Sequence, residues 1–300
     1  MKFPIPRPVE QLHGPATALR IRPRSKGNFT QTCNHVYAEA HGFGLVMDIF
    51  APASPTGLAI VDVVSGAWHS DRIRLNEHIG LGAIDALCDA GFTVFAVSPG
   101  SVVKFTGFDM IEHIHAAIRY IKTHATAFQI RTGSMGILGA SAGGHLAALA
   151  ALQPQEALPN ARDPFLQVNT HMQAMALYFP PTDLLNFDGK RFNIAESSGM
   201  PIGGLLFSEG AHHHTDAEID EKARALSPVH YVHPRMPPTL LIHGTADTVV
   251  PLQQSNLFEA RILSAGARVE RITREGGGHP WPDVAPENQQ MAQWFLRQLG

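Results

Sequence analysis

GILGASAGGHLAALAALQ, residues 136–153, is the stretch that decides the fold of this 300-residue chain. Residues 136–140 are an apolar run typical of a buried strand, and the Ala- and Leu-rich residues after them favour a helix. Between the two, GASAG fits the G-x-S-x-G pattern of a strained strand-to-helix turn that holds a serine, Ser141, at a helix N-terminus. The pattern alone is weak, but this context favours a nucleophile over a turn used only for packing.

Strand and helix patterns alternate along most of the chain. Apolar or alternating runs predict eight strands, at residues 35–42, 45–52, 58–65, 92–99, 136–140, 172–180, 238–244 and 268–275. Helical spacing predicts helices at residues 76–91, 109–125, 142–153, 215–226, 251–266 and 286–299. Gly91 is expected to end the first helix and Asp109 to be the N-cap of the second. The alternation predicts an α/β fold, a mostly parallel eight-stranded sheet flanked by helices.

Two segments stand outside this alternation. Residues 1–34 are rich in Pro, Arg and Gly without a sustained period, so we expect an N-terminal arm followed by one catalytic domain at 35–300. Residues 184–227 interrupt the alternation after a strand, with a Gly- and Ser-rich first part and a helical second part. Because ligands bind at the carboxyl edge of parallel sheets, a long insertion there predicts a small cap over the site.

Composition excludes several classes of protein. Hydrophobic residues make up 44% and charged residues 16%, which is typical of a globular protein. The formal net charge of -3 provides no basic field for nucleic acid, and no run of about 18 apolar residues predicts a membrane span. The N-terminus has prolines where a signal peptide needs an apolar segment, so we expect a cytoplasmic protein. Oligomeric state is left open by these patterns.

Cysteine and histidine patterns give no cofactor or metal site. Cys33 and Cys88 are too few for a disulfide framework or a complete zinc site. The run at residues 212–214 consists of three histidines, but consecutive residues rarely point at one ion, and no H-E-x-x-H spacing accompanies it. We therefore interpret this run as a loop.

A serine hydroxyl needs a base and a residue that orients the base. Asp247, in LIHGTADTVVP, and His279, in REGGGHPWP, each follow a predicted strand in the chain order Ser, acid, His. Taken singly, Asp247 is also a turn former and His279 a surface histidine, but the joint pattern predicts a catalytic triad with Ser141. Asp183 is an alternative acid, although the N-cap of a following helix is the favoured role.

Backbone N–H groups near the serine should stabilise the oxyanion of an acyl-transfer reaction. One candidate donor is Ala142, directly after the serine. The others are Gly66 and Ala67 in VSGAW, residues 64–68, a loop directly after a predicted buried strand. Small residues let the backbone approach a substrate there.

Two tryptophans flank these positions. Trp68 closes the oxyanion loop, and Trp281 follows His279 by two residues. Each side chain has two possible roles, as an aromatic wall for an acyl group or sugar, or as core. We name both as candidate residues of the substrate pocket.

Four segments between residues 64 and 282, SGAW, GASAGGHLAALAA, PPTLLIHGTADTVVP and GGGHPW, carry a family resemblance. In them the chain resembles bacterial α/β-hydrolase esterases related to feruloyl and acetyl-xylan esterases and to the hormone-sensitive lipase group. The resemblance implies the α/β-hydrolase fold, the triad and oxyanion donors named above, and hydrolysis of carboxylic esters without a cofactor or metal. Members of the group usually carry His-Gly-Gly-Gly-Trp where this chain has VSGAW, which makes the rigidity of that loop a question for the structure.

Two other functions stay open at this level. The catalytic domains of prolyl oligopeptidases share these motifs, but those enzymes usually carry a large N-terminal propeller that a short arm cannot supply. A non-catalytic hydrolase-fold binding protein is the second, favoured only by the altered oxyanion loop. For the esterase, the substrate is expected to be a small-molecule, carbohydrate or aromatic ester.

Overall fold

A computed structural model describes residues 28–192 and 203–300. Its strands are β1 (Phe29–Ala40), β2 (Phe43–Pro52), β3 (Ala59–Val63), β4 (Thr93–Val97), β5 (Met135–Ala140), β6 (Ala174–Tyr178), β7 (Thr239–Gly244) and β8 (Val269–Arg274). They form one eight-stranded sheet in the order β1-β2-β4-β3-β5-β6-β7-β8. The β1–β2 and β2–β4 pairs are antiparallel, and all others are parallel. The predicted mostly parallel eight-stranded sheet is confirmed.

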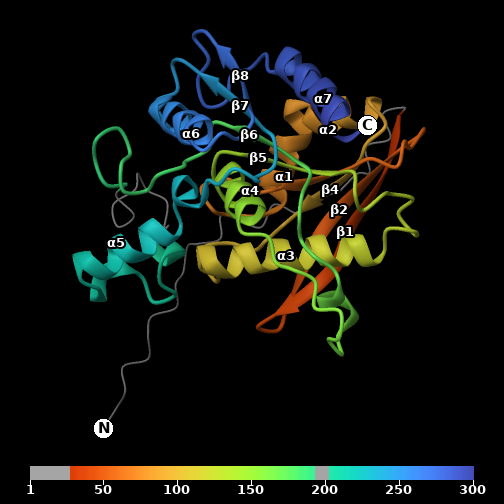
Figure 1. The fold of residues 1–300 in the computed structure, drawn as a ribbon, viewed down its shortest axis with the longest axis horizontal. Helices are drawn as coiled ribbons and strands as arrows, with labels where there is room; N and C mark the ends of the chain where they lie inside the picture. Colours follow the sequence, from red (N-terminus) through yellow and green to blue (C-terminus); the bar gives the residue numbers. More distant parts are fainter. Residues whose placement is uncertain (1–27, 193–202) are drawn as a thin grey trace.

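Helices cover both faces of the sheet (Figure 1). They are α1 (Arg72–Leu81), α2 (Ala83–Asp89), α3 (Gly107–Thr123), α4 (Ala142–Leu152), α5 (Asp216–Ala225), α6 (Gln253–Ser264) and α7 (Ala285–Leu299). Short 3₁₀ turns lie at Pro164–Gln167, Gly203–Leu205, Ala211–His213 and Pro228–Tyr231. Side chains of α3, α4 and α6 pack into one hydrophobic core, and those of α1, α2 and α7 pack into a second on the other face. Apart from the buried Asp62 of β3, the central strands are apolar because both of their faces are covered.

The helix predicted over residues 76–91 is wrong in its extent. The structure has two helices there, because Gly82 adopts φ 82°, a left-handed conformation that ends α1. Asp71 is the N-cap of α1 and accepts hydrogen bonds from two backbone N–H groups. The predicted N-cap Asp109 is also corrected: Thr106 caps α3, and Asp109 completes a capping box by bonding back to the Thr106 N–H.

The predicted N-terminal arm, residues 1–34, is too long at its C-terminal end. Strand β1 begins at Phe29, which pairs with Pro52 of β2. The Asn34 N–H and the Gln31 side chain both donate to the buried carboxylate of Asp48, which ties this part of β1 to the sheet. Residues 29–34 therefore belong to the sheet, and the remainder of the predicted arm, up to residue 27, lies outside the described residues.

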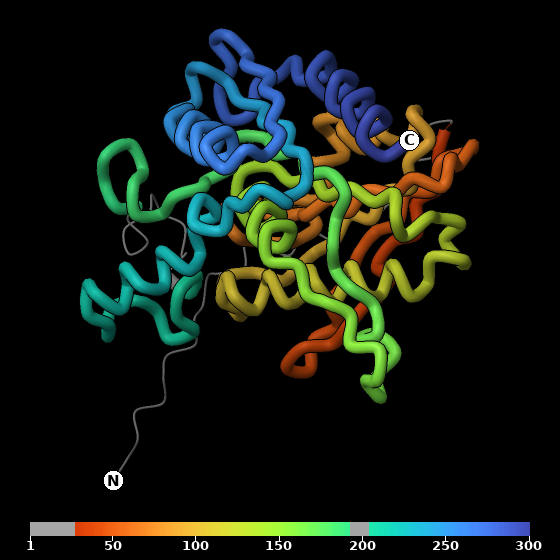
Figure 2. The backbone as a smooth tube through the Cα atoms, viewed as in Figure 1, coloured from red at the N-terminus to blue at the C-terminus, as the bar shows by residue number. Residues whose placement is uncertain are grey.

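The predicted insertion, residues 184–227, leaves and rejoins the domain at one place. The Leu184 N–H donates to Ser227 Oγ at 2.9 Å, and that hydroxyl donates to the Ala223 carbonyl at 2.7 Å. Helix α5 stands to one side of the layered body (Figure 2), and Leu226 at its end lies against Gly107 at the start of α3. Part of the insertion, residues 193–202, lies outside the described residues, so the cap remains a prediction.

None of the helices in the two described ranges combines the length and the apolar character that crossing a membrane requires.

A buried ion pair between β3 and α1 should make stability depend on pH. His78 Nδ1 lies 2.9 Å from Asp62 Oδ2. Burial alone would lower the pKa of His78, but the charge and hydrogen bond of Asp62 outweigh burial and raise that pKa above its ordinary value of about 6.5. A raised pKa in the folded state stabilises the fold below the unfolded value, and that contribution is lost as pH rises through the folded value.

We therefore expect His78→Gln to reduce the free energy of unfolding more at about pH 5.5 than at about pH 9, because the stabilisation by the ion pair is lost as pH rises through the raised pKa. Chemical denaturation of both proteins at the two pH values measures this difference. His213→Gln, at an exposed histidine, is the control and should show no such pH dependence. A loss from His78→Gln that is equal at both pH values would contradict the assignment.

Candidate active site

Ser141 lies in a strained turn between β5 and α4. Its backbone has φ 52° and ψ −124°, a conformation that residues with side chains rarely adopt. The Ser141 N–H donates to the Tyr178 carbonyl of β6 at 2.9 Å, which fixes the turn to the neighbouring strand. The turn leaves the serine half-buried, directly before the N-terminus of α4.

Two glycines make this turn possible by leaving no side chain. A Cβ at Gly139 would lie 2.3 Å from the carbonyl oxygen of Gly143, and a Cβ at Gly143 would lie 2.3 Å from that of Val63. Both contacts are with backbone, which cannot move aside cheaply. Close approach of three backbone segments therefore explains the glycines on either side of Ser141 in the G-x-S-x-G pattern.

We expect Gly143→Ala to lower kcat by about 10²-fold or more, because relief of the contact with Val63 must displace Ser141. The same strain should lower the free energy of unfolding by about 1–3 kcal/mol. Ester hydrolysis and thermal unfolding measure the two effects. The control is Gly133→Ala, where an added Cβ meets nothing within 4 Å. If both variants behave alike, the steric account of the turn is wrong.

The structure brings Ser141, His279 and Asp247 into one hydrogen-bonded chain. His279 Nε2 lies 2.9 Å from Ser141 Oγ, and His279 Nδ1 lies 2.7 Å from Asp247 Oδ2. Because a carboxylate can only accept, Nδ1 carries a proton, which leaves Nε2 of the neutral ring to accept from the serine hydroxyl. This is the arrangement in which a histidine can remove the serine proton.

The loops that hold the acid and the histidine are joined by their backbones. The Ala246 N–H donates to the Gly277 carbonyl at 2.9 Å, and a Cβ at Gly244 would lie 2.2 Å from that same carbonyl oxygen. The rings of Phe179 and His279 pack with their centroids 4.3 Å apart. Parallel strands β7 and β8 thus bring residues 32 positions apart in the sequence into contact.

Asp247 is a buried carboxylate with several donors. Oδ1 accepts from the N–H groups of Val249 and Val250 at 2.8 and 2.9 Å, while Oδ2 faces His279. Burial alone would raise the pKa of Asp247, but hydrogen bonds from two imidazoles and from the Val250 amide outweigh burial and hold that pKa well below its usual range. The side chain therefore stays negatively charged throughout the pH range in which esterases are assayed.

The second of these imidazoles belongs to His243, which the sequence reasoning missed. His243 is fully buried, and its Nε2 lies 2.9 Å from the Val250 carbonyl and 3.4 Å from Asp247 Oδ2. Both neighbours can only accept, so Nε2 carries a proton, and in the neutral ring Nδ1 accepts from Ser255 Oγ at 2.7 Å. The available signal was the histidine of LIHGTAD at the end of a buried strand.

The predicted oxyanion loop forms a tight turn, and this turn uses the N–H of Gly66, one of the three predicted oxyanion donors. The Gly66 N–H donates to the His69 carbonyl, and the His69 N–H donates back to Gly66, each at 2.9 Å. Ala67 and Trp68 between them have φ values of 47° and 57°, as in a type I′ turn. Gly66 is thus removed from the donor set because its N–H is already used. For Ala67 and Ala142, the described residues provide no backbone acceptor of the N–H.

The two predicted pocket tryptophans belong to the core. Trp68 and Trp281 are each only 4% exposed. The Trp68 Nε1–H donates to His145 Nδ1 at 3.1 Å, and that of Trp281 donates to Glu287 Oε2 at 3.2 Å. Of the two roles left open for these residues, the structure shows the packing role, and an aromatic wall for the substrate stays a prediction.

Asp183, the alternative acid, lies in a different hydrogen-bonding environment. Its Oδ1 accepts from the N–H groups of Leu185 and Asn186 at 2.9 and 3.2 Å. The side chain therefore closes a turn, as Asp side chains commonly do. The helix expected to follow it is absent within 184–192, so its predicted role as a helix N-cap is corrected to a turn cap.

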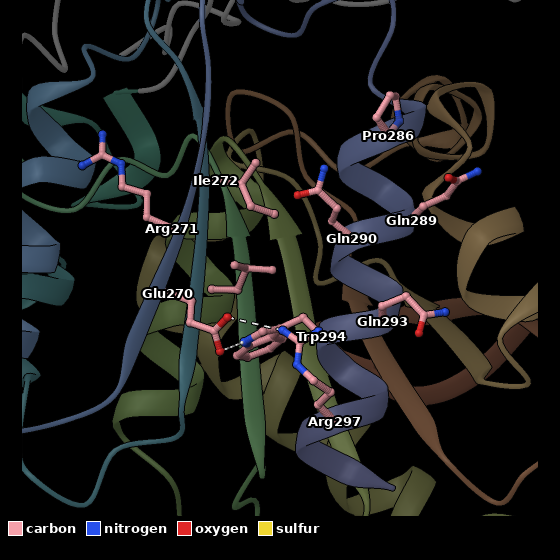
Figure 3. A pocket seen from close by; sticks show the side chains of 10 residues that line it. Glu270, Arg271, Ile272, Pro286, Gln289, Gln290, Gln293, Trp294 and Arg297 are labelled. Atoms are coloured by element: carbon pink, nitrogen blue, oxygen red, sulfur yellow. Dashed lines mark hydrogen bonds and ion pairs between the residues drawn. The ribbon is translucent and has the colours of Figure 1, made fainter.

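Other features of the described residues offer no competing site. An open groove of about 520 Å³ lies between β8 and α7 (Figure 3), but neither the Ser141, His279 and Asp247 chain nor the predicted oxyanion donors line it. Inside it, Glu270 accepts hydrogen bonds from Trp294 and Arg297. Within residues 28–192 and 203–300, no three His, Cys, Asp or Glu side chains gather closely enough to hold a metal ion.

The chain is similar to esterases in sequence and structure. The model of the BD-FAE family matches residues 47–262. Esterase LipQ of Mycobacterium tuberculosis is 28% identical over 228 residues, which cover 75% of this chain and 50% of LipQ. An acetylxylan esterase of Xylanibacter ruminicola is 30% identical over 118 residues, or 38% of this chain and 23% of that protein. This chain thus spans about half the length of LipQ and 23% of the length of the acetylxylan esterase.

Among solved structures, a truncated form of a carbohydrate esterase from gut microbiota superimposes with a TM-score of 0.77 and 26% identity. The superposition covers 92% of this chain and 98% of that one. The likeness therefore extends over nearly the whole length of both chains and confirms the α/β-hydrolase fold.

Proposed function

The chain belongs to the BD-FAE family of α/β-hydrolases, and we propose that it hydrolyses carboxylic esters through an acyl-enzyme formed on Ser141. The observation that carries the proposal is the unbroken chain of hydrogen bonds from Asp247 through His279 to Ser141. Its members follow three different strands of the parallel sheet and meet at one edge. The similarity to named esterases supports the reaction class independently.

In the first half of the reaction, His279 Nε2 takes the proton of Ser141 as Oγ attacks the ester carbonyl. The imidazolium that forms is stabilised by the charge of Asp247. The N–H groups of Ala67 and Ala142 stabilise the oxyanion, the second of them at the N-terminus of α4, where the helix dipole adds positive potential. His279 then returns its proton to the departing alcohol, which leaves the acyl group on Ser141.

In the second half, water replaces the alcohol. His279 takes a proton from water as the water oxygen attacks the acyl carbon, and the same N–H groups stabilise the second oxyanion. Collapse of this intermediate breaks the bond to Ser141 and returns the proton to Oγ. The acid is released and the enzyme is restored, and each step uses only side chains and amides of this chain.

Activity on a panel of substrates tests the proposal. The purified protein should hydrolyse at least one of p-nitrophenyl acetate, butyrate and octanoate, and acetylated xylan and methyl ferulate test the carbohydrate and aromatic esters. Gly-Pro-p-nitroanilide tests the peptidase alternative and should be cleaved far more slowly than the best ester. Faster cleavage of the anilide would favour a peptidase, and a folded protein inert on every substrate would favour a binding protein.

A further inference from the structure

His145 occupies a junction between three parts of the candidate site. It lies in the first turn of α4, fully buried, and its N–H donates to the Ser141 carbonyl at 3.0 Å. Its Nδ1 lies 3.1 Å from Nε1 of Trp68 in the oxyanion loop. Its Nε2 lies 2.6 Å from the carbonyl of Leu226, where the 184–227 insertion returns to the domain.

The partners of His145 determine its tautomer. An indole N–H can only donate, so Nδ1 must accept from Trp68, and a carbonyl can only accept, so Nε2 must donate to Leu226. Only the neutral ring with its proton on Nε2 satisfies both partners. Burial lowers the pKa of His145 to about 4, against a smaller opposing contribution from the bond to Leu226, which keeps the ring neutral near pH 7.

We propose that His145 is a positioning residue that holds the oxyanion loop, through Trp68, in register with the turn that carries Ser141. The same ring anchors both to the base of the insertion through Leu226. This role rests on the esterase function proposed above, because only that function requires the amide of Ala67 to be aimed at a substrate bound to Ser141.

The oxyanion loop needs such support because its turn is strained. Ala67 and Trp68 have positive φ values, which strain the backbone of residues that are not glycine. Contacts on several sides of Trp68 oppose this strain: its carbonyl accepts from the Val102 N–H at 2.9 Å, and its ring packs edge-on against His145 and against Phe192, with centroids 5.5 and 5.8 Å away. Two bonds link the loop to α4: the Gly143 N–H donates to the Ser65 carbonyl at 3.0 Å, and the bond to His145 holds the side chain of Trp68.

Trp68 also supports the VSGAW loop, which has fewer glycines than the His-Gly-Gly-Gly-Trp loop that similar esterases usually carry. A loop of glycines adopts positive φ without strain and so needs little to hold it. In this chain the side chain of Trp68, directly after Ala67, fixes the turn from one side. Loss of the bond to His145 should therefore let the turn shift and misdirect the Ala67 N–H, without removing any group that touches the substrate.

A double-mutant cycle between His145 and Trp68 tests this role. His145→Leu removes both ring nitrogens, and Trp68→Phe removes the indole N–H while keeping an aromatic ring. Each single variant should lower kcat on p-nitrophenyl acetate by about 10- to 100-fold with KM changed by less than about 3-fold, because only the transition state needs the aimed amide. The double variant should lose no more than the worse single variant, because both break one bond.

His145→Gln provides the conservative control. A glutamine amide can accept from Trp68 and donate to Leu226, so this variant should restore kcat to within about 3-fold of the wild type. Thermal unfolding checks that each variant is folded. If His145→Leu does not fold, His145→Ala replaces it in the same double-mutant cycle. The kcat of His145→Gln is then compared with that of Trp68→Phe.

The role is overturned if the losses in kcat multiply in the double variant, if the single variants change KM alone, or if His145→Gln is as impaired as His145→Leu. Each of these results would make His145 a packing residue without influence on the oxyanion loop. Failure of the proposed function is seen separately and earlier, because the wild type would then hydrolyse no ester before any His145 variant is measured.

Discussion

Ser141→Ala is expected to lower kcat on p-nitrophenyl acetate by about 10⁶-fold while leaving KM within a few-fold of the wild type. The variant lacks the oxygen that would form the acyl-enzyme, and the remaining donors only stabilise an attack by water. The residual rate should stay above the uncatalysed rate by about 10³- to 10⁴-fold if the Ala67 and Ala142 amides form an oxyanion hole. Steady-state kinetics with excess substrate measures these ratios.

The control for this variant is Ser134→Ala. Ser134 lies just before the opposite end of the same strand β5, and its backbone bonds are unaffected by the change. It should retain the kcat of the wild type. A folded Ser141→Ala protein that keeps more than about a tenth of the activity would exclude Ser141 as the nucleophile.

Asp247→Asn is expected to lower kcat by about 10⁴-fold. The reason lies in the donors around the side chain. Val249 and Val250 both donate to Oδ1, so the amide oxygen of asparagine should occupy that position and its NH₂ group should face His279. The NH₂ group would donate to His279 Nδ1 and place the ring proton on Nε2, where the ring can no longer accept from Ser141.

Asp183→Asn is the matched control, because Asp183 is the other acid that the sequence offered. An asparagine oxygen can still accept from Leu185 and Asn186, so the turn should persist. Activity of this variant should stay within about 2-fold of the wild type. If Asp183→Asn lost more activity than Asp247→Asn, the assignment of the orienting acid would be reversed. The kcat values of the two variants, compared at one pH, decide the point.

The sequence predicted the parts of the site that follow from sheet topology. Ser141, Asp247 and His279 follow strands that run in one direction, so their side chains must approach the same edge once those strands are neighbours. Apolar or alternating runs were enough to predict those strands. The close backbone contacts at Gly139 and Gly143 were also foreseeable, because the G-x-S-x-G pattern requires a turn too tight for side chains at these positions.

What the sequence missed depends on contacts between distant segments. The Gly66 N–H is used within a two-residue turn that composition does not reveal. The packing of Trp68 could not be predicted before the position of His145 was known. His145 and His243 could not be identified as functional candidates from the sequence, because it does not show which groups their rings contact. Folding brings Leu226 to His145, and the loop after β7 brings Asp247 to His243. A histidine in an apolar helix or strand looks like core until its ring nitrogens have partners.

Covalent labelling of Ser141 tests the central claim most directly. Diethyl p-nitrophenyl phosphate carries phosphorus in place of the ester carbonyl, and attack by Ser141 Oγ would release p-nitrophenol and leave a stable phosphoryl group on the serine. We expect one equivalent of p-nitrophenol per chain, a label that peptide mapping places on Ser141, and loss of ester hydrolysis in proportion to labelling. Ester hydrolysis that persists in a fully labelled protein, or inactivation with the label on another residue, would contradict the account.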